Sequence, residues 1–185
     1  ADYGTPLDDD TLLALAASLG ADVPFSLMGG TALGTGRGDE LVAMLSRGRL
    51  HWVFVNPKVG IPTGKAFSLL DDMRHNNATL VPHLNTQALS QALTSGDATR
   101  VAAAMHNDLE EPALAMRPQL ARLLDVAADA GLRAMVSGSG PTAAVLCDSL
   151  EHAQWVADYL AERFDGYEVF VAEGPDQGAV VESVF

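Results

Sequence analysis

Residues 132–174 limit the possible folds of the chain more than any other segment. The run RAMVSGSGPTAAVLC reads as a strand, a glycine-rich turn and a second strand. Apolar residues then recur at helical spacing over 149–164, and YEVFVAE alternates like a final strand. Helical patterns precede this block, so strands and helices do not alternate strictly. The pattern therefore predicts an α+β fold with helices on one face of a mostly antiparallel sheet.

The preceding part of the chain carries further predicted elements. Asp8 is placed to begin a helix that Gly20 ends, and the glycines between 29 and 38 indicate strands broken by turns. The most favourable domain boundary lies between these glycines and the next strong strand, which predicts domains over 1–46 and 47–185. We also expect a strand over 50–56, helices over 63–72, 86–95, 97–107 and 118–130, a loop over 74–83, and an edge strand over 179–185.

Charge and composition exclude several classes of function. The chain has 185 residues, of which 48% are hydrophobic, and a formal net charge of −13. An acidic chain argues against nonspecific nucleic-acid binding and against binding to anionic membranes. A small phosphorylated ligand remains compatible with this charge, because backbone N–H groups can hold phosphate without net positive charge.

Localisation and redox chemistry are also constrained by the sequence. No apolar run approaches the ~18 residues of a membrane span, and the start has no signal-peptide pattern, so we expect a cytoplasmic protein. The chain begins with Ala1 and not with methionine, which leaves open that it is a fragment. A single cysteine, Cys147, excludes an internal disulfide and a CxxC motif, and its apolar strand predicts a buried side chain.

Three segments carry residues that are suited to chemistry. Asp22 precedes a Val-Pro pair expected to be extended; its carboxylate is either a general base or a cap for the next segment. The turn VSGSGPT at 136–142 is either an anion-binding loop or a hairpin turn. Thr63 is placed to cap a helix, and Phe67 is suited either to stack on a flat ring or to pack in the core.

Metal chemistry has little support in the sequence. The five histidines lack the spacings of common metal sites, so no metal ligand is assigned. The acidic run at 107–111 is more typical of an exposed turn than of a metal site.

The ordered set of these motifs resembles the GHMP kinase superfamily. The matching strings are LGADVPFSLMGGTALGTGRGDEL, VNPKVGIPTGKAF, HNDLEEPALAMRPQL, MVSGSGPTAAVLC and EGPDQGA. Each string alone is weak, but their order is specific, and the likeness covers essentially the whole chain. Within the superfamily the strings are most similar to the branch that phosphorylates the 2-hydroxyl of a cytidine-diphosphate methylerythritol with ATP and Mg²⁺, in the non-mevalonate route to isoprenoids.

The resemblance implies a role for each matched residue. Asp22 corresponds to the aspartate that accepts the proton of the substrate hydroxyl. Gly138, Ser139 and Gly140 correspond to the glycine-rich turn beside the transferred phosphate. Thr63 and Phe67 correspond to the part of the cytidine pocket in which an aromatic ring lies against the base.

The family's ATP-binding loop has no counterpart in this sequence. The lysine that partners the aspartate and the N-terminal cytidine contacts are also absent. The resemblance therefore implies a C-terminal portion that is inactive alone and whose partner is the N-terminal part of the same protein. Residues 1–46 would be the remnant of a ribosomal-S5-like ATP-binding domain, and residues 47–185 a ferredoxin-like domain. The alternatives are another GHMP kinase, of homoserine or mevalonate type, and a non-catalytic ferredoxin-like binding module.

Overall fold

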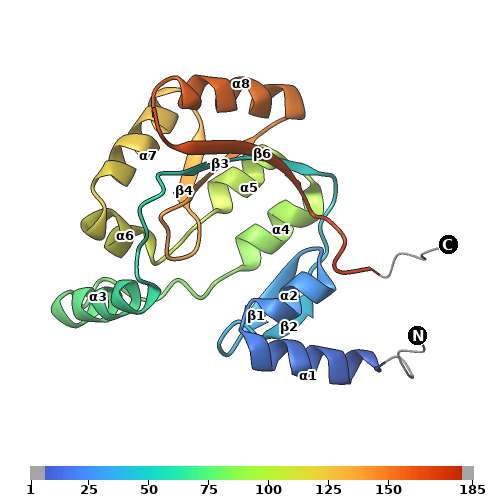
Figure 1. The fold of residues 1–185 in the computed structure, drawn as a ribbon. Coiled ribbons are helices and arrows are strands. Elements are labelled where there is room, and N and C mark those ends of the chain that lie inside the picture. The colour runs from blue at the N-terminus through green and yellow to red at the C-terminus, as the bar shows by residue number, and fades with distance from the viewer. Residues whose placement is uncertain (1–6, 181–185) are drawn as a thin grey trace. The chain divides into compact units, whose positions relative to one another are not determined.

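The computed structural model describes residues 7–180, whose helices and strands are labelled in Figure 1. These residues form two compact units. The first unit comprises the described residues up to Ser46 together with those from Pro175 onward, and the second comprises Arg47–Gly174. The sequence predicts a single domain over 47–185, whereas the structure groups the described residues from Pro175 onward with the first unit. The edge strand predicted over 179–185 falls mostly outside the described residues.

Two helices and a hairpin form the first unit. Its elements are α1 (Asp9–Leu19), α2 (Val23–Met28), β1 (Ala32–Thr35) and β2 (Glu40–Ala43), with β1 and β2 antiparallel. The Asp8 side chain accepts the Thr11 N–H at 2.8 Å, which confirms the predicted helix start. The C-terminal segment returns to this unit, where Gly30 donates to the Asp176 carbonyl and Ala179 donates to the Ser26 carbonyl.

Glycine is required where this C-terminal segment crosses α2. A Cβ atom added at Gly29 would collide with the backbone of Gly178, and one added at Gly178 would collide with the Leu27 carbonyl. Gly29 also has a φ of +62°, which L side chains rarely adopt. These two glycines let the backbones touch, and this close approach explains why residues after Pro175 belong to the first unit.

A four-stranded antiparallel sheet forms the centre of the second unit. The strands are β3 (Leu50–Asn56), β4 (Arg133–Val136), β5 (Ala143–Cys147) and β6 (Glu168–Gly174), in the order β4-β5-β3-β6. Helical connections follow β3 and β5, which gives the split βαβ arrangement typical of ferredoxin-like domains. The predicted α+β class and antiparallel sheet are therefore confirmed.

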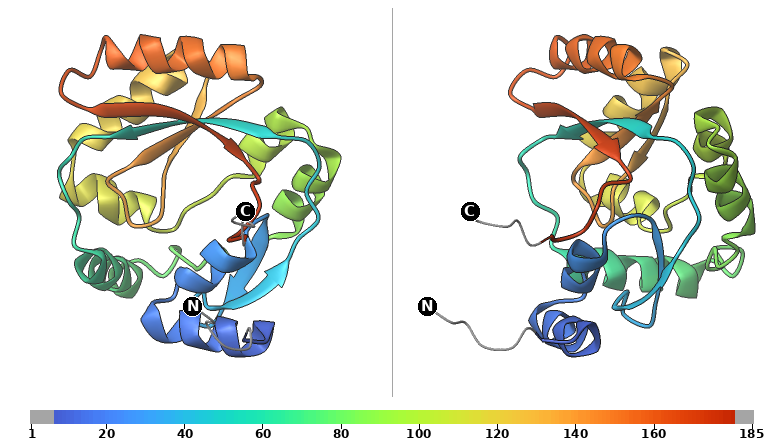
Figure 2. Two further views of the ribbon diagram at one scale, coloured as in Figure 1. Left: turned by 45° about the vertical axis from the view of Figure 1, so that its right-hand side comes forward. Right: turned by 90° about the vertical axis from the view of Figure 1, so that its right-hand side faces the viewer.

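Helices α7 (Gln119–Asp129) and α8 (Leu150–Ala161) cover one face of this sheet, as Figures 1 and 2 show. Val53 and Val145 are fully buried there, because alternate strand residues point to the same face, and Leu160 of α8 is fully buried in the same core. Cys147 belongs to this core, as predicted, and burial together with the nearby Asp148 carboxylate raises the pKa of its thiol to about 11.

The remaining helices lie between β3 and α7 in the sequence. They are α3 (Thr63–Asn76), α4 (Gln87–Ser95), α5 (Ala98–Ala104) and α6 (Glu110–Met116). Figure 1 shows α4 and α5 on the side of the sheet opposite to α7 and α8. Helix α3 continues past the predicted end at residue 72 into the segment expected to be a loop. Helix α6 was not predicted.

Candidate functional site

Asp22 lies at the start of α2 in the first unit. It is the residue before the helix, and its carboxylate makes no capping hydrogen bond there. Its side chain is exposed, so the carboxylate is accessible to a ligand. The extended Val-Pro pair is a wrong prediction, since Val23 and Pro24 form the first turn of α2. Proline fits this turn because the first N–H groups of a helix have no intrahelical acceptor.

The glycine-rich turn joins β4 to β5 in the second unit. Two internal hydrogen bonds define it: Gly140 donates to the Ser137 carbonyl at 2.9 Å, and Ser137 donates to the Thr142 carbonyl at 2.8 Å. Gly138 and Gly140 have φ values of +57° and +77°, which explains the glycines. Among the described residues, the N–H groups of Gly138 and Ser139 donate to no acceptor, so both donors are available to a ligand oxygen.

Thr63 and the glycine-rich turn meet directly. The Thr63 and Ser139 hydroxyl oxygens lie 2.9 Å apart although 76 positions separate the residues in the sequence. Thr63 is the first residue of α3, and Pro62 occupies the capping position, so the predicted capping role of Thr63 is wrong. Its hydroxyl is used instead to join the start of α3 to the turn.

Phe67 follows Thr63 by one helical turn, so both residues project from the same side of α3. The Phe67 side chain is 51% exposed, which excludes the core role that its residue type suggests. An exposed ring beside a pair of hydroxyls and free N–H groups is suited to stack on a flat ligand ring.

Packing beneath these residues holds the start of α3 against the turn. Ile61 is buried with Val136 and Ala113 in a small core. A Cβ atom at Gly140 would lie 3.1 Å from Ile61 Cδ1, so this glycine permits the close contact. The Arg117 guanidinium donates to the Gly60 carbonyl at 2.8 Å and fixes the loop before Ile61.

The acidic run at 107–111 is not the exposed turn that its composition predicts. Asn107, Asp108 and Glu110 are partly buried, and each of them makes hydrogen bonds outside the run. Asn107 and Glu110 contact the glycine-rich turn and the end of β4. Sequence reasoning missed these contacts because they join segments about 30 positions apart.

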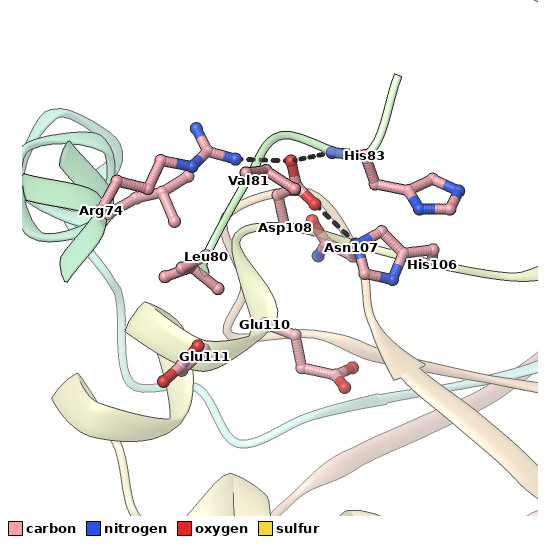
Figure 3. A pocket seen from close by; sticks show the side chains of 10 residues that line it. Arg74, Leu80, Val81, His83, His106, Asn107, Asp108, Glu110 and Glu111 are labelled. Atoms are coloured by element: carbon pink, nitrogen blue, oxygen red, sulfur yellow. Dashed lines mark hydrogen bonds and ion pairs between the residues drawn. The ribbon is translucent and has the colours of Figure 1, made fainter. Parts of the chain in front are cut away.

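Asp108 is the centre of a polar cluster shown in Figure 3. Its carboxylate pairs with Arg74 at 2.6 Å and with His106 at 2.6 Å, and it accepts the His83 N–H at 3.1 Å. Desolvation opposes ionisation of Asp108, but the hydrogen bonds from His106 and His83 and the Arg74 charge outweigh it and lower the pKa of the carboxyl. A cavity of about 260 Å³ adjoins this cluster, with Leu70 and Leu80 in its wall.

In the part of the chain that the structure describes, no three His, Cys, Asp or Glu side chains gather as metal ligands would. Nor does any described helix have the length and apolar character needed to cross a bilayer.

Comparison with known proteins gives consistent matches. Residues 89–166 match the family described as GHMP kinases C terminal. A 4-diphosphocytidyl-2-C-methyl-D-erythritol kinase of Corynebacterium diphtheriae is 45% identical over 97% of this chain, and one of Nocardia farcinica is 48% identical over 95%. The chain spans 55% and 57% of these two relatives, so it matches little more than half of their length.

Solved structures agree with this result. A crystal structure of 4-(cytidine 5'-diphospho)-2C-methyl-D-erythritol kinase superposes with a TM-score of 0.71 and 28% identity, over 91% of this chain and 58% of that one. A homoserine kinase from Cytophaga hutchinsonii superposes with a TM-score of 0.69 at 21% identity, over 95% of this chain and 61% of that one. The second likeness concerns the fold alone.

Proposed function

We propose that this chain, whose residues 89–166 match the GHMP kinases C terminal family, belongs to a GHMP kinase and takes part in phosphorylating the 2-hydroxyl of 4-diphosphocytidyl-2-C-methyl-D-erythritol. ATP is the phosphoryl donor in this proposal. The observation that carries the proposal is the meeting of Thr63 with Ser139, which brings a segment suited to a nucleobase next to a turn suited to phosphate. The names of relatives at 45% and 48% identity support the same substrate.

The second unit would bind both the cytosine base of the substrate and the phosphoryl group that is transferred. The exposed Phe67 ring would stack on cytosine, with the Thr63 hydroxyl beside it. The free N–H groups of Gly138 and Ser139 would donate to oxygens of the transferred phosphoryl group, where negative charge develops. The proximity of these segments would hold the substrate in one orientation. Such positioning, together with charge stabilisation, provides most of the rate enhancement in enzymatic phosphoryl transfer.

Asp22 would act as the general base. The substrate hydroxyl oxygen would attack the γ-phosphorus of ATP, its proton would pass to the Asp22 carboxylate, and ADP would leave. A carboxylate oxygen within hydrogen-bond reach of a hydroxyl can accept its proton, which suits Asp22 to general-base catalysis. The carboxylate is exposed and makes no capping hydrogen bond at α2, so no internal contact of that kind has to be broken first.

The ATP cradle is assigned to a segment outside this sequence. Residues 1–46, with which the described segment from Pro175 onward groups, would be the end of the domain that holds ATP, and Arg47–Gly174 would form the substrate-side domain. Mg²⁺ would neutralise charge on the ATP phosphates, and we assign no residue of this chain to it. The chain by itself is accordingly expected to be inactive.

A transfer assay with labelled ATP tests the proposal. The chain would be assayed alone and joined behind the segment of the Corynebacterium diphtheriae kinase that it does not match. We expect the joined protein to phosphorylate the cytidylyl substrate and neither homoserine nor mevalonate. Transfer to homoserine or mevalonate instead, or binding of the cytidylyl substrate without any transfer, would contradict the proposal. No observation specifically favours a homoserine kinase, a mevalonate kinase or a non-catalytic module.

A further inference from the structure

Two side chains from the 107–110 segment hold both backbone groups of a single residue, Val136. The Asn107 side-chain amide donates to the Val136 carbonyl at 2.7 Å and to the Gly138 carbonyl at 2.8 Å. The Glu110 carboxylate accepts the Val136 N–H at 2.9 Å. Val136 is the last residue of β4, so these contacts lie where the strand passes into the glycine-rich turn.

The position of β4 explains why such contacts matter. In the described sheet β4 is an edge strand whose strand neighbour is β5, so one side of its backbone has no strand partner. The internal hydrogen bonds of the turn use the carbonyls of Ser137 and Thr142 and leave the Gly138 carbonyl free for Asn107. The pair Asn107 and Glu110 therefore takes the place of a missing strand at this edge.

The orientation of the Asn107 amide is set by a third contact. Its side-chain oxygen accepts the Leu109 N–H at 2.9 Å, which leaves the NH₂ group to face the two carbonyls. The carbonyl oxygens of Val136 and Gly138 can only accept hydrogen bonds, so the group that faces them has to be a donor. An aspartate at this position would keep the contact to Leu109 and would present an oxygen to both carbonyls instead.

The same segment is attached to α3 at its other side. Asp108 pairs with Arg74 near the end of α3, and Thr63 at the start of α3 bonds to Ser139 in the turn. The start of α3 therefore contacts the turn, the turn contacts Asn107, and the neighbouring Asp108 contacts the end of α3. These contacts together fix the turn relative to the helix that carries Phe67.

We propose that Asn107 and Glu110 are positioning residues that hold the glycine-rich turn in place for phosphoryl transfer. The inference rests on the proposed function for its catalytic consequence, whereas the clamp itself is a property of this chain. Neither side chain is assigned to touch substrate, and both act through the turn. Misplacement of a catalytic group by about 1 Å can cost about 100-fold in rate, so a small displacement of the turn is enough.

Amide hydrogen exchange of this chain tests the clamp without any catalysis. Asn107→Asp is expected to accelerate exchange at Ser137 and Gly140 by about 10-fold or more, because the turn loses its donor. Glu110→Ala is expected to do the same at Val136, while Glu110→Gln, which keeps an acceptor oxygen, restores slow exchange. Glu111→Ala is the matched control, since Glu111 is the next residue of α6 and is exposed. Unchanged exchange in both Asn107→Asp and Glu110→Ala would overturn the proposal.

Kinetics of the joined protein test the catalytic consequence. We expect Asn107→Asp and Glu110→Ala to lower kcat by about 10- to 100-fold, while KM for the cytidylyl substrate stays within about twofold. A merely destabilised protein would instead unfold at a lower temperature and keep its kcat per folded molecule. Faster exchange with unchanged kcat and unchanged KM for ATP would overturn the positioning role. Absence of transfer by the unsubstituted joined protein would contradict the proposed function and this catalytic role, and exchange would still decide whether the clamp exists.

Discussion

At the scale of single residues, the proposed reaction depends most on the Asp22 carboxylate. Asp22→Asn keeps the size of the side chain and removes its basicity, so we expect kcat of the joined protein to fall by about 10²- to 10⁴-fold. Nucleotide affinity should stay the same, because the base contacts the substrate hydroxyl. Transfer rates and nucleotide titration measure the two effects.

Asp39→Asn is the matched control for this substitution. Asp39 lies in the turn of the β1–β2 hairpin, where its carboxylate pairs with exposed Arg37 at 2.7 Å. Asp39→Asn removes the same single negative charge, but Asp39 has no assigned role in transfer. A rate near that of the unsubstituted protein for Asp22→Asn would show that another group accepts the proton.

The Phe67 ring is the second residue whose removal has a specific expected effect. Phe67→Ala should raise KM for the cytidylyl substrate by about 10-fold or more and leave KM for ATP unchanged, because one stacked base is worth about 1–3 kcal/mol. Phe170→Ala is the control: Phe170 is 47% exposed, against 51% for Phe67, but it stacks on Phe54 in the sheet. Equal changes in both KM values would favour a packing role for Phe67.

At the scale of elements, Asp108 joins the end of α3 to the segment before α6. Asp108→Asn should destabilise this chain by about 1–2 kcal/mol at neutral pH, a value reduced because the Arg74 pair is partly exposed. The pKa of Asp108 is lowered from 3.8, so its contribution is present above that pH and is lost as the pH falls through the lower folded-state value. Urea unfolding of both proteins at about pH 6 and about pH 2.5 measures the difference.

The expected outcome is a gap in unfolding free energy that closes in acid. Asp72→Asn provides the control, because Asp72 is an exposed residue of α3 one helical turn before Asn76. A gap that stays constant down to the lowest pH would show that the cluster does not depend on the charge of Asp108.

The elements that the sequence predicted well are those with a strong local signal. Strand β3 ends before Pro57, and α1 begins after Asp8, because each boundary is set by neighbouring residues. Helices α2 and α6 were missed because each contains a proline, Pro24 or Pro112, within its first turn. Proline breaks a helix when it lies in the interior, so it argues against a helix in a sequence. In the first turn it removes only an N–H that has no intrahelical acceptor, and the helix is tolerated.

The candidate site was predictable only in part for a related reason. Exposure of Phe67 and the contact of Thr63 with Ser139 depend on which segments the sheet brings together. The hydrogen bond from Asn107 to the Gly138 carbonyl joins residues that are 31 positions apart, and an asparagine at position 107 is equally compatible with a turn. Long-range hydrogen bonds of this kind leave no periodic pattern in a sequence.

At the scale of the whole molecule, the described residues of the first unit expose an apolar face. If the proposed function holds, this face packs against the segment outside this sequence. Helix α1 carries exposed leucines, and a groove of about 380 Å³ in this unit is lined almost entirely by apolar side chains. The lining residues are Leu12, Leu15, Ala16, Ser18, Leu19, Val23 and Leu27. Apolar surface of this extent is typical of an interface, and an ATP-binding domain completed by the joined segment would cover it.

Leu19→Lys distinguishes an interface from a solvent-facing helix. The Leu19 side chain is 79% exposed, so the substitution should change the stability of this chain alone by less than about 0.5 kcal/mol. In the joined protein the same lysine would be buried against apolar surface, and we expect a lower unfolding temperature and reduced transfer. Leu84→Lys, at 84% exposure in the second unit, should have neither effect. Identical behaviour of the two variants in the joined protein would mean that α1 faces solvent, and the assignment of residues 1–46 to an ATP-binding domain would lose its physical basis.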